Sequence, residues 1–416
     1  MKKLLIALLC LALLLAACAA PVQTTDDHYR QPPTMPQADE SLSPNDFAFR
    51  LAAALLQHSD ADENFVLSPY SVWLPLAALV NATQEQYRPV LLQALGVAGM
   101  PVPQLNEDTA RTLGFLTRRS PIGNGEYNPS PLQIANAVFV HDDLTLLPAF
   151  AEMFAQYFNG EALSTDFNNP VQAAAFINQW ISDNTHGLID RVITPNMFDN
   201  DTIAVIANAI YFSARWQAQF DPAHTELGTF TAPGGETEAY FMHLESWFDA
   251  YYANDYLQAV NLPFNSGGGM MIMLPRNGNA TGLLSGMTAD EFTRIQDNAA
   301  RAEGTLQLPR FRIENTLDRL TDALIALGVP LFGGEPLTGG LIAEDLPMWL
   351  NSALQAAMID VDEQGTTAAA VTIMTAFGSA APQQPDDIFE MICNMPFVFM
   401  LHQQGQVLFT GVVNQP

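Results

Sequence analysis

The chain has 416 residues, 49 % of them hydrophobic, and a formal charge of −28 at pH 7. This length and hydrophobic content allow one large domain or two ordinary ones, and they argue against disorder over most of the chain. The strong negative charge argues against binding to nucleic acid or to anionic lipid head groups, because like charges repel.

The amino terminus has the pattern of an export signal. Lys2 and Lys3 precede an apolar run over residues 4–17, which is too short to span a bilayer as a stable helix. The run ends in LAAC at residues 15–18, which resembles the lipobox of bacterial lipoproteins. This resemblance implies a signal peptide at 1–17 and a lipidated Cys18, and plain secretory cleavage is the alternative. We therefore expect a membrane-anchored lipoprotein of the cell envelope that faces the periplasm or the extracellular space.

The next residues predict a flexible tether followed by one domain. Residues 18–43 carry several prolines among Gln, Thr and Asp, with few large apolar side chains. From residue 44 to residue 416 neither a second linker nor an internal repeat interrupts the chain. We therefore expect a single domain over 44–416.

The domain mixes helical and strand patterns without strict alternation. Apolar residues at helical spacing predict amphipathic helices at 47–56, 74–78, 150–158 and 173–181. Continuous apolar runs predict strands at 202–212, 270–274, 398–401 and 407–413. The first of these strands suits the middle of a large buried sheet. The patterns alone therefore indicate an α+β fold with a large sheet.

The sequence offers no recognisable catalytic or metal-binding motif. Its seven histidines are scattered, and the spacings HExxH, CxxC and GxSxG are absent. The run His141-Asp142-Asp143 favours a solvated turn over a metal site. Cys393 lies in a strand-like apolar run, which favours a buried small side chain over a reactive thiol. We therefore expect neither an enzyme nor a cofactor or metal site.

The informative stretch runs from Asp360 to Pro385. Its start overlaps IDVDEQG at residues 359–365, an alternating strand pattern that ends at Gly365. From Gly365 to Ala381 there is no charged residue, although exposed loops usually carry polar side chains. The stretch could be a core strand or a poor alanine helix. A segment that is a loop in one state and a strand in another fits better, because neither of its alternating faces carries a charge.

This stretch resembles the hinge and reactive-centre loop of inhibitory serpins. The family's hinge reads Glu-x-Gly-Thr-x-Ala-Ala-Ala, and the chain has EQGTTAAA at residues 363–370. Further blocks that resemble the family follow its order along the chain: NFVLSPYS (64–71), IAN (134–136) with Phe139, DF (166–167), INQW (177–180) before THG (185–187), NAIYF (208–212) with Trp216 and Phe220, LPRF (308–311) with LG (327–328), and PFVF (396–399) with LFTG (408–411).

The resemblance implies an α+β serpin fold, with about nine helices around three β-sheets, a large central sheet and an exposed reactive-centre loop at about 363–387. It assigns the hinge to Glu363, Gly365, Thr366, Ala368, Ala369 and Ala370. It also implies a polar cluster beneath the point where the central sheet opens, formed by Ser68, Ser71, Asn208 and Gln355.

Three positions depart from the family pattern. The family's GAxGxT block is NATQE at residues 81–85, without either glycine. Gln355 stands where the family has a histidine, which bears on the barrier to sheet opening because glutamine still donates and accepts hydrogen bonds. Thr367 replaces a common glutamate, which is a neutral change.

The resemblance implies inhibition of proteases by suicide-substrate trapping, with the cut loop inserting into the central sheet. Family spacing puts the scissile bond sixteen residues beyond Glu363, at Ser379–Ala380, and the alternative is Phe377–Gly378. The loop lacks Arg and Lys, so a trypsin-like target is not expected. We expect a serine protease of the elastase, subtilisin or chymotrypsin type, or a papain-like cysteine protease.

Two other functions stay open at this point. One is a non-inhibitory serpin that acts as a carrier or structural protein, and the other is a lipoprotein module that binds a ligand. The uncharged, small side chains of the hinge favour the inhibitor over both. We expect a monomer whose partners are its target protease and the membrane, without nucleic acid.

Overall fold

The computed structural model describes residues 43–57, 62–118, 121–123, 126–127, 132–189, 191–198, 201–317, 319–351, 353, 355–366 and 388–416. In these ranges no helix is both long and apolar enough to cross a membrane. The expectations for the signal peptide and the tether lie outside the described residues. So do those for the lipidation site, the distal hinge and both candidate scissile bonds: Cys18, Ala368, Ala369, Ala370, Phe377, Gly378, Ser379 and Ala380.

Within the described ranges there are nine α-helices, and several begin with proline, which has no N–H to leave unpaired in a first turn. The four helices expected from apolar spacing are confirmed as α2, α3, α6 and α7. The helices are α2 (Pro44–Leu56), α3 (Pro69–Leu79), α4 (Arg88–Ala94), α5 (Val102–Leu116), α6 (Pro148–Phe158), α7 (Pro170–Asn184), α8 (Ala280–Ser285), α9 (Ala289–Asn298) and α10 (Leu320–Ala326).

The largest sheet has nine strands and holds much of the main core. Its last two strands in the chain, β17 and β18, are almost entirely buried. Along the sheet the order is β1 (Phe65–Leu67), β18 (Gln406–Val413), β17 (Phe397–Gln403), β11 (Gly269–Pro275), β10 (Leu257–Pro263), β9 (Gly235–Ala253), β12 (Ala300–Pro309) and β16 (Phe389–Ile392), with β8 (Glu226–Ala232) paired to β9.

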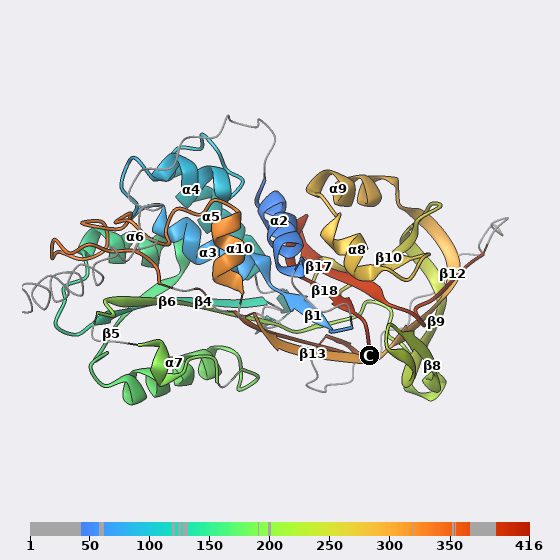
Figure 1. Cartoon of the computed structure of the whole chain (residues 1–416). Helices are drawn as coiled ribbons and strands as arrows, with labels where there is room; N and C mark the ends of the chain where they lie inside the picture. The colour runs from blue at the N-terminus through green and yellow to red at the C-terminus, as the bar shows by residue number, and fades with distance from the viewer. Residues whose placement is uncertain are drawn as a thin grey trace, which may run out of the picture.

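Two smaller sheets follow, the first below α3 and α10 in Figure 1 and the second below α2 and β1. The first has the order β5 (Gly160–Thr165), β4 (Leu132–His141), β6 (Ala204–Phe212). The second has the order β13 (Phe311–Thr316), β14 (Ala356–Val361), β15 (Gly365–Thr366), β7 (Ala214–Arg215). Because β7 follows β6 after one residue, the two sheets are halves of one central sheet that is joined only at the β15 end.

Short elements complete the described chain. They are a hairpin of β2 (Pro121–Gly123) and β3 (Glu126–Tyr127) and the 3-10 turns η2 (Pro195–Met197) and η3 (Pro222–His224).

Successive side chains of β4 point to opposite faces of the sheet and contribute to two separate hydrophobic cores. Val138 and Val140 face the main core, whereas Ala137 and Phe139 face a small core beneath α7. Figure 1 accordingly shows α7 on the opposite face of the sheet from α3.

Two sequence expectations need correction. The strand at 202–212 forms as β6, but most of it is only half-buried, because it is the last strand of its half-sheet. The strand of IDVDEQG ends at Val361 and not at Gly365, since Asp362 to Gln364 form a turn. Gly365 instead begins the next strand.

Candidate functional site

A slot lies between the two halves of the central sheet. Its walls are Ile210 to Phe212 of β6 and Ala356 to Asp360 of β14, and Thr366 closes one end. Leu401 and Phe409, from the main core, line its inner side and form the floor. Thr185, Leu188 and Ile189, which follow α7 on the other face, also line the slot. The slot therefore has the outline of a missing strand.

The first two residues of the hinge already form a strand at the mouth of this slot. Thr366 pairs with Val361 on one side and with Ala214 on the other, and Gly365 pairs with Arg215. Thr366 is 2 % exposed, and its hydroxyl finds no hydrogen-bond partner among the described residues. The chain therefore enters the gap between the two half-sheets from this end.

Gly365 is required by the close approach of the neighbouring strand. Its φ angle is +155°, and a Cβ atom there would lie 2.0 Å from the carbonyl oxygen of Ala214. The carboxylate of Asp362 shapes the preceding turn by accepting from the amides of Gln364 and Gly365, at 2.8 and 3.1 Å. A side chain at residue 365 would push the hinge away from β7.

A charged group, here called the upper cluster, fixes the turn before the mouth; it consists of Glu363, Arg310, Thr225 and Trp216. One carboxylate oxygen of Glu363 accepts from Arg310 Nε at 2.8 Å, from its Nη2 at 2.5 Å and from Thr225 Oγ1 at 2.5 Å. Burial alone would raise the pKa of Glu363, but these hydrogen bonds outweigh it and hold the pKa below its ordinary value. Glu363 is therefore ionised at neutral pH.

Trp216 holds the same turn next to the nine-stranded sheet, at the end of β10. Its backbone amide donates to the carbonyl of Gln364 and its indole N–H to the carbonyl of Asp362, both at 2.9 Å. The indole ring stacks on Phe264 at 4.9 Å between centroids. The turn thus has backbone, side-chain and ring contacts that hold it in place.

A neutral group, here called the lower cluster, lies at the other end of the slot; it consists of Ser68, Ser71, Asn136, Asn208 and Gln355. Gln355 accepts from the amide of Ser68 at 2.9 Å and donates to the carbonyl of Ser68 at 2.8 Å. The Ser68 hydroxyl donates to the carbonyl of Leu408 at 2.8 Å. Gln355 therefore ties the start of β14 to the beginning of α3.

The other half of the lower cluster ties β6 to the same helix. Ser71 donates to the amide oxygen of Asn208, and Asn208 donates to Asn136 of β4 at 2.7 Å. Asn136 in turn donates to the carbonyl of Phe158 at 2.7 Å. Since Ser68 and Ser71 both belong to the first turn of α3, one helix end is bonded to both walls of the slot.

The four residues of the expected polar cluster all lie in the lower cluster, and Glu363, Gly365 and Thr366 lie at the mouth of the slot. Sequence reasoning gave no role to Asn136, Arg310 and Thr225. Asn136 and Arg310 lie in blocks that resemble the family, so their positions carried a signal. Thr225 carried none.

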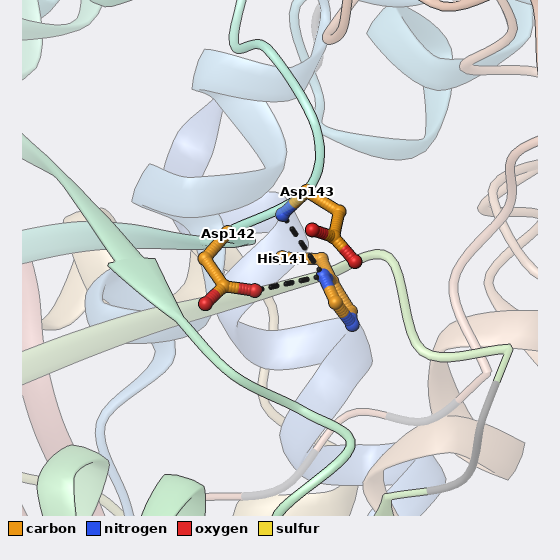
Figure 2. Close-up of side chains that lie close together, drawn as sticks. All are labelled: His141, Asp142 and Asp143. Atoms are coloured by element: carbon orange, nitrogen blue, oxygen red, sulfur yellow. Dashed lines mark hydrogen bonds and ion pairs between the residues drawn. The ribbon is translucent and has the colours of Figure 1, made fainter.

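Figure 2 shows the turn of His141, Asp142 and Asp143, whose potential ligand atoms lie within 4.8 Å of one another. Neighbouring protein groups contact both ring nitrogens of His141. Nδ1 accepts from the amide of Asp143 at 3.2 Å, and Nε2 lies 3.1 Å from the side-chain nitrogen of Asn168.

Cys393 is fully buried, as expected, and burial raises the pKa of its thiol.

Comparison with known proteins accounts for this arrangement. A family model described as serpin (serine protease inhibitor) matches residues 42–416. The chain is 30 % identical to a serpin-like protein of Thermococcus kodakarensis over 89 % of this chain and 84 % of that one. It is 26 % identical to human neuroserpin over 87 % and 88 % of the two chains.

A solved structure, Serpin48 of the insect Tenebrio molitor, superposes with a TM-score of 0.74. It is 26 % identical and covers 89 % of this chain and 96 % of the insect protein. The fold is therefore the serpin fold, and this chain belongs to the serpin family.

Proposed function

We propose that this chain is a single-use inhibitor of serine endopeptidases, and of papain-like cysteine endopeptidases, that traps its target by inserting the cut reactive loop into the slot. The observation that carries this proposal is β15, which pairs with a strand on each side at the mouth of an unfilled strand position. Members of the family are generally protease inhibitors and not catalysts, which supports the same function.

The two registers at the mouth define where an inserted loop would lie. Each further loop residue moves one residue back along both walls, starting from Thr366 opposite Val361 and Ala214. Residue 368 then lies between Ile359 and Phe212, residue 370 between Ala357 and Ile210, and residue 372 between Gln355 and Asn208. The loop would thus run from the upper cluster to the lower cluster.

The composition of the loop suits this path. Thr366, Ala368, Ala370, Thr372 and Met374 would share the face that meets the apolar floor, and none of them is charged. Burying a charge in this layer would cost several kcal/mol, whereas small neutral side chains enter at little cost. Sixteen inserted residues would span about 50 Å, which is enough to carry an attached protease across the molecule.

The covalent step is an ordinary acyl transfer. The nucleophile of the protease attacks the carbonyl carbon of Ser379, the amide bond to Ala380 breaks, and the proton of the nucleophile passes to the new amino group of the carboxy-terminal fragment. The protease is then held as an acyl ester, or a thioester for cysteine, that water must hydrolyse. Insertion of the loop must be faster than this hydrolysis.

The residues around the bond set the target class. Ser379 and Ala380 have small side chains, which suit elastase-like, subtilisin-like and papain-like clefts. Cleavage after Phe377 would suit a chymotrypsin-like protease. The sequence of the loop therefore supports proteases that accept small or aromatic side chains.

A protease panel tests this function. The protein is incubated with one protease of each class, and the products are separated on denaturing gels and analysed by mass spectrometry. We expect an SDS-resistant complex with at least one member and a released fragment that begins at Ala380. A fragment that begins at Gly378 would move the site to Phe377. Cleavage by every protease without any complex would refute inhibition by trapping.

We also propose that the inhibitor is tethered to the membrane through lipid on Cys18. The LAAC sequence supports this location, and the family match begins only at residue 42, which leaves a spacer between anchor and domain. Cys18→Ser should release the protein from the membrane fraction or block its processing. A variant that fractionates and migrates like the parent would contradict the tether.

A further inference from the structure

The segment that covers the slot on the α7 side consists of residues 185–189, here called the roof. Thr185, Leu188 and Ile189 line the slot directly. The Thr185 hydroxyl donates to the carbonyl of Ile181 at 2.8 Å, and it accepts from the amide of Ile189 at 3.3 Å. The roof is therefore a compact loop that continues from the end of α7.

His186 holds a left-handed backbone conformation in the middle of the roof. Its φ angle is +54°, and that of Gly187 is +77°. A residue with a Cβ atom is disfavoured in this region by about 1 kcal/mol, so the surrounding contacts must stabilise it. His186 itself is exposed and does not line the slot, but its neighbours Thr185 and Leu188 do.

The side chain of His186 makes the contacts that join the roof to one wall. Its Nε2 atom lies 3.1 Å from the side-chain oxygen of Gln133, and its ring meets the ring of Tyr211 edge-on at 4.5 Å. Gln133 of β4 and Tyr211 of β6 lie directly opposite each other in the ladder. One imidazole therefore spans two strands of the same half-sheet.

The other wall has no such connection. Among the described residues, the hydrogen bonds of the roof go to α7, to the roof itself and to β4, and none reaches β14. The roof is thus hydrogen-bonded to the β4–β6 half-sheet, whereas it covers the β14 side of the slot without a hydrogen bond to it. When the half-sheets separate, the roof stays with β6 for as long as His186 keeps its contacts.

We propose that His186 is the latch of the slot, a positioning residue that holds the roof down and limits how fast a strand enters. This inference rests on the proposed function. Continuing the register from Thr366 opposite Ala214 brings residue 369 beside Tyr211, on the roof face of the sheet. Ala369 would therefore arrive next to the His186 ring, so the ring or the roof must yield during insertion.

A strand-uptake assay tests the latch without a protease. The probe is a synthetic peptide with the sequence of residues 367–379, and uptake is followed on native gels and by the rise in thermal stability. His186→Gly removes the ring and suits the left-handed backbone, so the variant should fold. We expect it to take up the peptide about five times faster than the parent, because one hydrogen bond and one ring contact no longer oppose opening.

The chain offers a matched control in Gln404→Gly. Gln404 and Gly405 have φ angles of +53° and +79°, nearly those of His186 and Gly187, but they form the turn between β17 and β18. Gln404→Gly should leave the uptake rate unchanged. If it accelerates uptake as much as His186→Gly, or if neither variant does, the latch is refuted.

A second peptide tests for direct contact between His186 and residue 369, because its uptake rate would not depend on His186 if that residue only stabilised the fold. A peptide carrying Ala369→Leu should enter the parent more slowly than the unmodified peptide, and this difference should shrink in His186→Gly. An equal difference in both proteins would refute contact between residue 369 and the latch. A parent that takes up no peptide and traps no protease would overturn the proposed function itself, whereas trapping without dependence on residue 186 would overturn only the latch.

Discussion

The two clusters at the ends of the slot differ in their chemistry. The upper cluster is built around an ionised carboxylate that receives three hydrogen bonds, two of them from a guanidinium group. The lower cluster consists of serine hydroxyls and side-chain amides without any charge. The clusters also differ in exposure, because the Arg310 side chain of the upper cluster is 45 % exposed whereas Ser68, Ser71, Asn136 and Gln355 of the lower cluster are buried.

This difference matches what each cluster would have to do during insertion. In the proposed mechanism the turn at Glu363 would stay in place while the loop beyond it moved, and a charge-assisted network is suited to a fixed point because breaking it is costly. The lower cluster lies where the inserted strand would pass between Gln355 and Asn208. Neutral amides and hydroxyls can exchange partners there without stranding a buried charge.

The largest effect should come from a charge placed at the mouth. Thr366 is already buried against the floor of the slot in the uncut protein, so Thr366→Arg would push the hinge out of the mouth, and insertion would then have to bury a cation in an apolar layer at a cost of at least several kcal/mol. Each 1.4 kcal/mol felt in the transition state slows insertion about tenfold. We expect the variant to become a substrate, cut at the same bond, with at least about a tenfold rise in inhibitor needed per protease.

Thr366→Val is the matched control for this change. The Thr366 hydroxyl has no hydrogen-bond partner among the described residues, so its replacement by a methyl group should leave inhibition intact. Trapping by Thr366→Arg at near one-to-one stoichiometry would contradict insertion from this hinge. It would point instead to simple blockade of the active site.

The second effect tests the lower cluster. Gln355→Ala leaves the amide and carbonyl of Ser68 without their buried partner, which should cost about 2–4 kcal/mol in the free energy of unfolding. It should also speed spontaneous loop insertion, because α3 would then hold only the β6 wall. Denaturant unfolding measures the first quantity, and loss of inhibitory activity during incubation measures the second. An unchanged lifetime would show that this link does not restrain opening.

The fold and the residues at the two described ends of the slot could be predicted from the sequence because short contiguous blocks of the chain specify them. The hinge EQGTTAAA and the paired serines near residue 68 are contiguous in the chain, and helical and strand periodicities located the main elements. The contacts across the slot could not be predicted in this way. Thr225, Arg310 and His186 meet their partners only through tertiary packing, and nothing in their own neighbourhoods specifies those partners. The half-buried state of β6 likewise depends on a gap that the sequence of β6 does not reveal.

A third prediction concerns the pH dependence of the upper cluster. The folded pKa of Glu363 lies below its ordinary value of 4.5, so its ionic contacts stabilise the fold above that pH and are lost as the pH falls through the folded pKa. Glu363→Gln should lower the free energy of unfolding by about 1–2 kcal/mol at neutral pH, a modest cost because Arg310 is half-exposed. The difference between parent and variant should shrink below pH 4.5. Unfolding curves at several pH values would contradict this assignment if the difference stayed constant.

The smallest expected effect tests whether the inserted loop contacts the lower cluster. The register at the mouth carries Thr372 between Gln355 and Asn208, on the face of Thr366, so its hydroxyl would meet amide groups there. Thr372→Val keeps the shape and removes that hydroxyl. The cut, inserted form should lose about 0.5–1.5 kcal/mol of stability, while the uncut protein should be unchanged. Denaturation of both forms side by side measures this contrast. Equal losses in both forms would mean that Thr372 makes its contact before cleavage, and no loss in either would mean that the inserted strand follows another register.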